Sequence, residues 1–397
     1  MLHQKKIQLS NKKCLYRMIS ENPGISRAEL AVGTHLSKTT VSSLVEQLIQ
    51  DEYIVDAGCS KRGIQGRSPN DLHVDAERNC VVVCNLRKKV LQLAVVSTAY
   101  EVETIIEIAL PEGSVALTAI IAPVREFILA ESANRRVAGV CMIIPGIIDS
   151  KREEIISVVL PVRDAKDLIG EFRRNLSDLY PVAIFNDTSC FAYAENAFGD
   201  IGFHDYIYIN INEGVGASFV QDGNLVTGAS GMGTQFGHLS IRRDGVPCVC
   251  GNHGCLENYI GESVLKSRII ELGILGEFAN PERILFKDVG RLAEAGSEGA
   301  LKLIATLAED LSYGLGNLLT LFHLEKVVIG GMGRNLGRLY LDEVQRQVRL
   351  FGFRHFTRLV DIEFTRLNED ALFTGAAKYY MDQCYEFNGV PEGGLYI

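Results

Sequence analysis

The first seventy residues carry apolar positions at helical spacing. Residues 10–20 place their apolar side chains on one side of a predicted helix, which Pro23 ends. Ser26 and Glu29 form a capping box at the start of a second, short helix. A third helix, capped by Ser37, has apolar residues at i, i+3, i+4, i+7 and i+8: Val41, Leu44, Val45, Leu48 and Ile49. Helix, tight turn and longer helix in this order predict a helix-turn-helix.

Beyond residue 80 the hydrophobic period changes. Short apolar or alternating runs separated by turns predict strands, and longer amphipathic runs predict helices. The predicted strands are 80–85, 90–97, 102–109, 137–144, 182–185, 206–211, 217–220 and the strand-then-glycine turn at 326–333. The predicted helices are 117–132, 307–322 and a terminal helix from Gly375. Because the strand pattern restarts near residue 206, the body is predicted to be α/β with two lobes.

The third predicted helix is the candidate recognition helix, because the second helix of a helix-turn-helix pair enters the major groove. Its polar residues off the apolar stripe are the candidate DNA contacts: Lys38, Thr39, Thr40, Ser42 and Ser43. Residues 1–70 hold ten lysines and arginines against six aspartates and glutamates, a net charge of +4 in a chain of −9. A basic head on an acidic body favours double-stranded DNA as the partner. A helical hairpin used for dimerisation is the alternative.

A basic loop follows the predicted strand that starts at Tyr53. Gly58 to Pro69 contains Lys61, Arg62 and Arg67 between glycines, which is typical of a wing whose cations contact phosphates or a minor groove. A flexible linker with solvated charges is the other interpretation. Ser68-Pro69 is expected to close the head domain.

Four potential metal ligands lie close together in the sequence. His238 precedes Cys248, Cys250 and Cys255, and this set suits one tetrahedral Zn²⁺ with no position left for water. A closed site of that kind is structural. A disulfide or a loop of free cysteines is the alternative.

Composition limits the remaining possibilities. The chain has 397 residues, 47% of them hydrophobic, which is enough for two or three packed domains. No apolar run is long enough to cross a bilayer, and no signal peptide is indicated, so we expect a cytoplasmic protein. The seven scattered cysteines are expected to act as small apolar residues: Cys14, Cys59, Cys80, Cys84, Cys141, Cys190 and Cys384.

The pattern of Gly237-His238 followed by Cys248-x-Cys250-Gly-x-x-Gly-Cys255-x-Glu257 resembles the signature of the ROK family of repressors and sugar kinases. The resemblance extends over nearly the whole chain and implies an actin-like (ribonuclease H-like) ATPase fold. The implied domains are a winged helix-turn-helix at 1–70, a first lobe at 71–185 completed by 372–397, and a second lobe at 186–371.

The same resemblance implies a sugar site. Asn186 and Asp187 directly follow a strand and match the family's sugar-binding pair, in which the aspartate is the general base of the kinases. Glu257 matches a sugar-binding carboxylate, and His238 has one ring nitrogen on zinc and the other toward the sugar. Gln235 stands where most members have glutamate, so the preferred sugar is expected to differ. For Asn186-Asp187 taken alone, a simple turn is equally compatible.

This sequence lacks most of the residues that form the phosphate-binding turns of the family's kinases. The family's Asp-x-Gly-x-Thr turn is replaced by Asn85-Leu-Arg-Lys-Lys89, which has neither glycine nor carboxylate, and Glu213 adds negative charge to the second turn. Phosphoryl transfer depends on positioning and charge neutralisation, so we expect no ATP-dependent activity. The sequence thus predicts a transcriptional regulator that forms a homodimer or a higher homo-oligomer, a repressor controlled by a sugar or sugar phosphate. A sugar kinase with a DNA-binding head and a repressor switched by a protein partner are the rival hypotheses.

Overall fold

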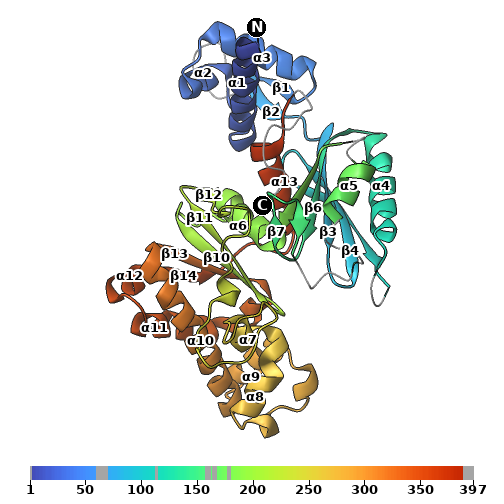
Figure 1. Cartoon of the computed structure of the whole chain (residues 1–397). Coiled ribbons are helices and arrows are strands. Elements are labelled where there is room, and N and C mark those ends of the chain that lie inside the picture. The colour runs from blue at the N-terminus through green and yellow to red at the C-terminus, as the bar shows by residue number, and fades with distance from the viewer. Residues whose placement is uncertain are drawn as a thin grey trace. The chain divides into compact units, whose positions relative to one another are not determined.

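The computed structural model describes residues 2–59, 70–111, 115–156, 162, 168–176 and 180–387. The chain divides into two units (Figure 1): unit 1 comprises residues 1–190 and 370–397, and unit 2 comprises residues 191–369. The division falls inside helix α6 (Asp187–Phe198) and just before α13 (Ala371–Tyr379). Each unit is built around its own five-stranded sheet.

The head of unit 1 contains three helices and a hairpin (Figure 1). They are α1 (Leu2–Glu21), α2 (Arg27–Thr34), α3 (Lys38–Gln50), β1 (Ile54–Cys59) and β2 (Asn70–Val74). The capping box of Ser26 and Glu29 and the cap by Ser37 are both present, as predicted. Helix α1 begins at Leu2, eight residues before the predicted start, because its polar first turns contain good helix formers but no apolar stripe to reveal them.

The core of the head forms from the apolar stripes that the sequence indicates. Val41, Leu44, Val45 and Leu48 of α3 are buried, together with Leu15 and Ile19 of α1. Burial of these stripes on one another fixes α3 with its opposite face exposed. The basic loop with Lys61, Arg62 and Arg67 lies outside the described residues.

The first body sheet has the strand order β5-β4-β3-β6-β9. Its strands are β3 (Asn79–Leu86), β4 (Val90–Ser97), β5 (Val102–Ala109), β6 (Arg136–Ile144) and β9 (Val182–Asn186). Helices α4 (Thr118–Ser132) and α5 (Leu168–Leu176) cover one face and α13 covers the other (Figure 1). The short pair β7 (Ile148–Asp149) and β8 (Glu154–Ile155) follows β6. With helices on both faces, β3 is buried along its whole length.

The second sheet, in unit 2, has the order β12-β11-β10-β13-β14. Its strands are β10 (Tyr206–Ile211), β11 (Val215–Gln221), β12 (Asn224–Leu225), β13 (Lys326–Gly330) and β14 (Asp361–Phe364). The helices of this unit are α7 (Glu257–Ile260), α8 (Leu265–Glu271), α9 (Phe286–Glu294), α10 (Glu298–Phe322), α11 (Gly337–Gln347) and α12 (Arg354–Leu359). The apolar side chains of α7 to α11 form one core with this sheet.

Two further helices, both in the body, start earlier than predicted. Helix α10 begins at Glu298, capped by Ser297, rather than at 307, and its added turns bury Leu303 and Ile304 in the core of unit 2. Helix α13 begins at Ala371 rather than at Gly375. The predicted strands agree with the observed ones to within two residues at each end, because their apolar runs are bounded by clear turns.

None of the helices in the described part of the chain is long and apolar enough to cross a membrane. The nine described cysteines are free thiols. Among the scattered ones, Cys80, Cys84, Cys141, Cys190 and Cys384 are buried, as expected of small apolar residues, and Cys14 is half-buried. The side chain of Cys59 lies outside the described part of the structure.

Candidate functional sites

The N-terminal half of α3 presents an exposed polar surface. Lys38, Thr39, Thr40, Ser42 and Ser43 are all exposed. The Ser37 hydroxyl caps the helix by accepting from the backbone N–H of Thr40 at 3.1 Å, and it lies 2.9 Å from the Thr39 hydroxyl and 2.8 Å from that of Thr40. The two threonine hydroxyls are therefore held in place by the cap, while the two serines remain on the exposed face. Small polar groups at a helix N-terminus suit contacts to bases or phosphates.

In unit 2, the chain brings His238, Cys248, Cys250 and Cys255 together. One ligand atom from each of the four residues lies within 4.8 Å of the others. The His238 Nδ1 is 3.5 Å from the Cys248 Sγ, and the Cys250 Sγ is 3.6 Å from the Cys255 Sγ. A metal–sulfur bond of about 2.3 Å in a tetrahedron places neighbouring ligands about 3.8 Å apart, so the spacing fits one ion. The four residues can hold a metal, and the disulfide interpretation is wrong because all three cysteines are free thiols.

Tight turns between the ligands make this cluster possible. Gly251 has a φ of +91° and Gly254 a φ of +69°, values that favour glycine. A Cβ added to Gly254 would lie 1.8 Å from the carbonyl oxygen of Arg242, so the two ligand segments pack too closely for any other residue. The loop is thereby closed around the three sulfur atoms.

The thiols of the cluster differ in their surroundings. Burial raises the pKa of Cys255 to about 12 and also raises the pKa of Cys248. A hydrogen bond from the backbone N–H of Asn252 lowers the pKa of the exposed Cys250 thiol. A bound cation favours the thiolate form of all three side chains, which are soft ligands.

Glu257 lies beside the metal cluster. Its Oε1 is 3.7 Å from the His238 Nδ1, and its Oε2 accepts from the backbone N–H of Val215 at 3.4 Å. A Cβ on Gly214 would lie 2.8 Å from the same Oε2. The second glycine turn is therefore packed against the Glu257 carboxylate, and one of its backbone amides already donates to it.

In unit 1, Asn186 and Asp187 lie at the end of β9 and the start of α6. The Asn186 amide donates to the carbonyl of Gly146 at 2.8 Å, and its Oδ1 accepts from the backbone N–H of Ser189 at 3.1 Å. The Asp187 Oδ1 accepts from the backbone N–H of Thr188 at 2.7 Å. Asn186 thus caps the start of α6, and the Asp187 carboxylate accepts from Thr188 through Oδ1.

Burial raises the pKa of Asp187, and four interactions oppose it: hydrogen bonds from the backbone N–H and the hydroxyl of Thr188, the positive charge of Arg87, and a hydrogen bond with the backbone of Asp187 itself. Arg87 follows β3 in the tight turn to β4, where its backbone N–H donates to the Val90 carbonyl at 2.9 Å. The sequence did not predict the electrostatic effect of Arg87 on Asp187, because the basic run at 87–89 is separated from Asp187 by 98 residues or more. The only available signal was the replacement of the turn's glycine by a cation.

Gln235 lies three residues before His238, and its side-chain amide donates to the Gly233 carbonyl at 3.2 Å. The structure thus forms one pair of predicted sugar ligands in unit 1, Asn186 and Asp187, and another in unit 2, His238 and Glu257. Gln235 contacts its own loop, and its side chain is exposed.

Comparison with known proteins agrees with the fold. The ROK family model matches residues 90–383, and a winged helix-turn-helix DNA-binding model matches residues 7–55. A xylose repressor from Caldicellulosiruptor bescii is 27% identical over 95% of this chain and 96% of its own length. A glucokinase from Halalkalibacterium halodurans is 28% identical, but the match covers 48% of this chain and 61% of the glucokinase.

The same architecture occurs in the crystal structure of a ROK family transcriptional regulator, a homologue of the Escherichia coli Mlc protein. The two chains share 23% identity and superpose with a TM-score of 0.80 over 94% of this chain and 96% of the other. The predicted fold is confirmed. The chain therefore belongs to the ROK family, with an N-terminal winged helix-turn-helix joined to the family's actin-like α/β body.

Proposed function

We propose that this protein is a cytoplasmic transcriptional regulator, a repressor that binds operator DNA as a homodimer and responds to a sugar or sugar phosphate. The exposed polar face of α3, on a head whose apolar stripes are buried, carries this proposal. The full-length match to a relative named xylose repressor supports it, since that match includes both head and body.

For the metal cluster, we propose one structural Zn²⁺ held by His238, Cys248, Cys250 and Cys255. Three thiolates and one imidazole form a closed tetrahedral shell, which suits zinc and leaves no coordination position for a substrate. Bound there, the ion would hold the loop that carries His238 and place Glu257 beside it.

The effector is proposed to contact Asn186, Asp187, Gln235, His238 and Glu257. Carboxylate, amide and imidazole groups accept from and donate to sugar hydroxyls in fixed directions, and this set contains all three. Asn186 also has a positioning role, because both polar atoms of its side chain already bond within unit 1. Arg87, whose charge acts on Asp187, would favour an effector that carries a phosphate.

Homodimer formation is proposed because of how such heads bind operators, and an apolar surface of unit 2 supports it. A helix-turn-helix commonly binds two half-sites through a two-fold dimer. Leu318, Leu321 and Phe322 at the C-terminal end of α10 line a cavity of about 370 Å³, with Phe219 and Phe236. Leu321 is 78% exposed, so a second copy of this chain seated here would bury a large apolar side chain.

The rival function, a sugar kinase, has less support. Residues 87–89 form a tight hairpin turn between β3 and β4 without glycine, and the second turn gives the Val215 amide to Glu257. Backbone amides that cradle phosphates need an open, glycine-rich turn. We therefore propose that the protein does not transfer phosphate from ATP.

Information about the effector is proposed to reach the head through the C-terminal segment, here residues 371–387. Its Tyr379 ring lies 5.3 Å from the ring of Phe185, next to Asn186. Farther along, the Tyr385 hydroxyl donates to that of Tyr53 at 2.8 Å, and the Phe387 ring lies 4.7 Å from the Tyr53 ring. The segment therefore contacts both the strand that ends at the proposed effector residues and the head.

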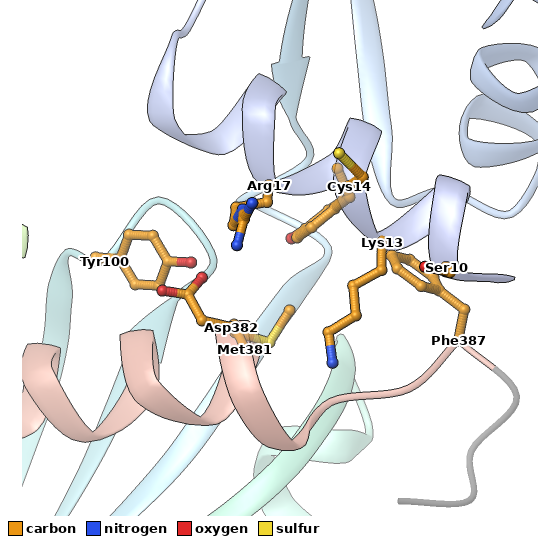
Figure 2. A pocket seen from close by; sticks show the side chains of 9 residues that line it. Ser10, Lys13, Cys14, Arg17, Tyr100, Met381, Asp382 and Phe387 are labelled. Carbon is orange, nitrogen blue, oxygen red and sulfur yellow. The ribbon is translucent and has the colours of Figure 1, made fainter. Parts of the chain in front are cut away.

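Helix α1 and the C-terminal segment line a small cavity of about 200 Å³ (Figure 2). Lys13 and Arg17 extend from α1 toward it, and Asp382 and Met381 face them from the C-terminal segment. Lys13 also pairs with Glu386 at 3.0 Å. A change in the C-terminal segment would thus act directly on the helix that supports the recognition helix.

A thermal-shift screen of sugars and sugar phosphates, followed by operator binding with each hit, tests the proposed function. A ligand that binds only the native state raises the unfolding midpoint, and a true effector should also release the protein from DNA. Robust ADP release with any common hexose and ATP, abolished by Asp187→Asn, would instead establish the kinase.

A further inference from the structure

Helix α10 carries a buried carboxylate at its midpoint. Asp310 is 7% exposed, and both of its oxygens accept from arginines: Oδ1 from Arg242 at 2.9 Å and Oδ2 from Arg268 at 2.7 Å. The Arg268 side chain is 3% exposed, whereas that of Arg242 is 40% exposed. A charge held this far from water requires partners in good geometry, and here one anion joins two cations from different segments.

One of these cations belongs to the metal-binding loop. Arg242 lies between His238 and Cys248, and its guanidinium stacks on the Tyr259 ring with 4.3 Å between the guanidinium carbon and the ring centroid. The Tyr259 hydroxyl accepts from the backbone N–H of Val246 at 3.2 Å, two residues before Cys248.

The backbone around Arg242 also leads to the third sulfur ligand. Its carbonyl oxygen is the atom that a Cβ on Gly254 would meet, and Gly254 immediately precedes Cys255. The Ile241 N–H donates to the Gly254 carbonyl at 2.8 Å. Arg242 and its ring partner therefore contact the chain next to Cys255 and two residues before Cys248.

We propose that Asp310 is the positioning residue of the metal site: through Arg242 it fixes the ligand loop to α10 and thereby determines how firmly the ion is held. This inference rests on the proposed zinc site. Arg268 gives the clamp its rigid side, since it joins the same carboxylate to α8 and lies 5.4 Å from the Tyr259 ring centroid. Residues that support metal ligands without touching the metal set affinity in this way.

The test uses full-length zinc-loaded protein and a chromogenic chelator. Asp310→Asn keeps the shape of the side chain but removes the nearer of the two carboxylates that pair with Arg242, the other being Glu271 at 3.6 Å. Arg242→Met removes the half-exposed partner, together with its stack on Tyr259 and its ion pair with Glu271. It leaves the Asp310–Arg268 pair intact, so it tests the clamp even if Asp310→Asn folds poorly. Zinc release is expected to be about 10- to 100-fold faster in both variants. In the double variant the two effects should be less than additive, because they break one contact.

Glu195→Gln is the matched control. Glu195 is another buried carboxylate of unit 2, 2% exposed and hydrogen-bonded to Thr365. It should leave the rate of zinc release unchanged, whatever its effect on the thermal midpoint. If Asp310→Asn and Arg242→Met lower only the midpoint, the carboxylate is merely structural and the positioning role is wrong. Wild-type protein that binds no zinc would overturn both the proposed site and the positioning role.

Discussion

At the scale of single residues, Asn186 and Asp187 show how one motif can divide its tasks. The Asn186 side chain bonds to Gly146 and to the first turn of α6, so it holds the strand end in place. Asp187 accepts from the backbone N–H of Thr188 through Oδ1, and burial raises its pKa. A group held in a less favourable charge state is often kept for binding or catalysis.

Asp187→Asn should weaken effector binding and leave operator affinity without effector nearly unchanged. Its effect on stability follows from the raised pKa. Folded protein binds this proton more tightly than unfolded protein, so the contribution is favourable below the unfolded pKa of about 3.9 and is lost as pH rises through the folded value. The variant, which cannot ionise, should therefore unfold at a higher temperature than wild type at pH 7. Equal thermal midpoints of the variant and the wild type at pH 7 would contradict this prediction.

Cys250→Ser should lose the metal and part of the stability together. Cys250 is exposed, so the substitution costs little packing, and any loss of stability reports the metal bond. For a structural zinc site, binding energy contributes directly to folding energy. Metal analysis should find about one zinc per chain in wild type and much less in the variant. Cys14→Ser, at a half-buried cysteine outside the cluster, should retain the metal.

At the scale of elements, α3 is positioned by its buried stripe and oriented by its cap. Ser37 bonds to the first turn, and the adjacent hydroxyls of Thr39 and Thr40 lie against it. The helix N-terminus also provides unpaired backbone N–H groups that favour phosphate.

Thr39→Ala should weaken binding to the true operator by about 1–3 kcal/mol if the side chain contacts a base edge, with little change on random DNA. Competition binding at one fixed salt concentration measures both. Ser37→Ala serves as the comparison. Loss of the cap costs about 1 kcal/mol of stability and should weaken binding to the operator and to random DNA by the same factor. If both variants bind the operator as wild type does, α3 is not the recognition helix.

At the scale of the whole molecule, the exposed apolar end of α10 is the proposed contact between two copies. Leu321→Asp should shift the protein toward monomer in sedimentation or light scattering, because a carboxylate would have to be buried without a partner. Leu301→Asp, at another exposed leucine of the same helix, should leave the oligomeric state unchanged. An unchanged dimer in Leu321→Asp would place the interface elsewhere.

The C-terminal segment is the proposed link between effector and head. Phe387→Ala removes a ring packed against Tyr16 and Tyr53 and should reduce the factor by which effector weakens operator binding, a factor that is typically 5- to 150-fold in allosteric proteins. Effector affinity without DNA should change little. Phe353→Ala, which removes a half-exposed ring of unit 2, should leave the coupling intact. Full coupling in Phe387→Ala would show that the signal takes another route.

The sequence by itself determined the helices of the head, the five strands of the first sheet, three strands of the second sheet and the composition of the metal cluster, whereas α8, α9, α11, α12 and β14 of unit 2 were not predicted. Caps such as Ser26 with Glu29, the stripe of α3 and the alternating runs of the sheets depend on neighbours a few residues apart, so their signals are local. The cluster of His238 with three cysteines was equally readable, because its ligands lie within 18 residues of one another. Polar first turns without an apolar stripe hid the start of α1.

Only the tertiary structure decided which distant groups meet. Asp310 is 68 residues from Arg242 and 42 from Arg268, and no local pattern relates them. Phe387 reaches Tyr53 because α13 packs on the first sheet, although the two rings lie at opposite ends of the chain. Such contacts are set by how whole elements bury their apolar faces, and a buried charge then finds its partner on whichever element the packing brings near.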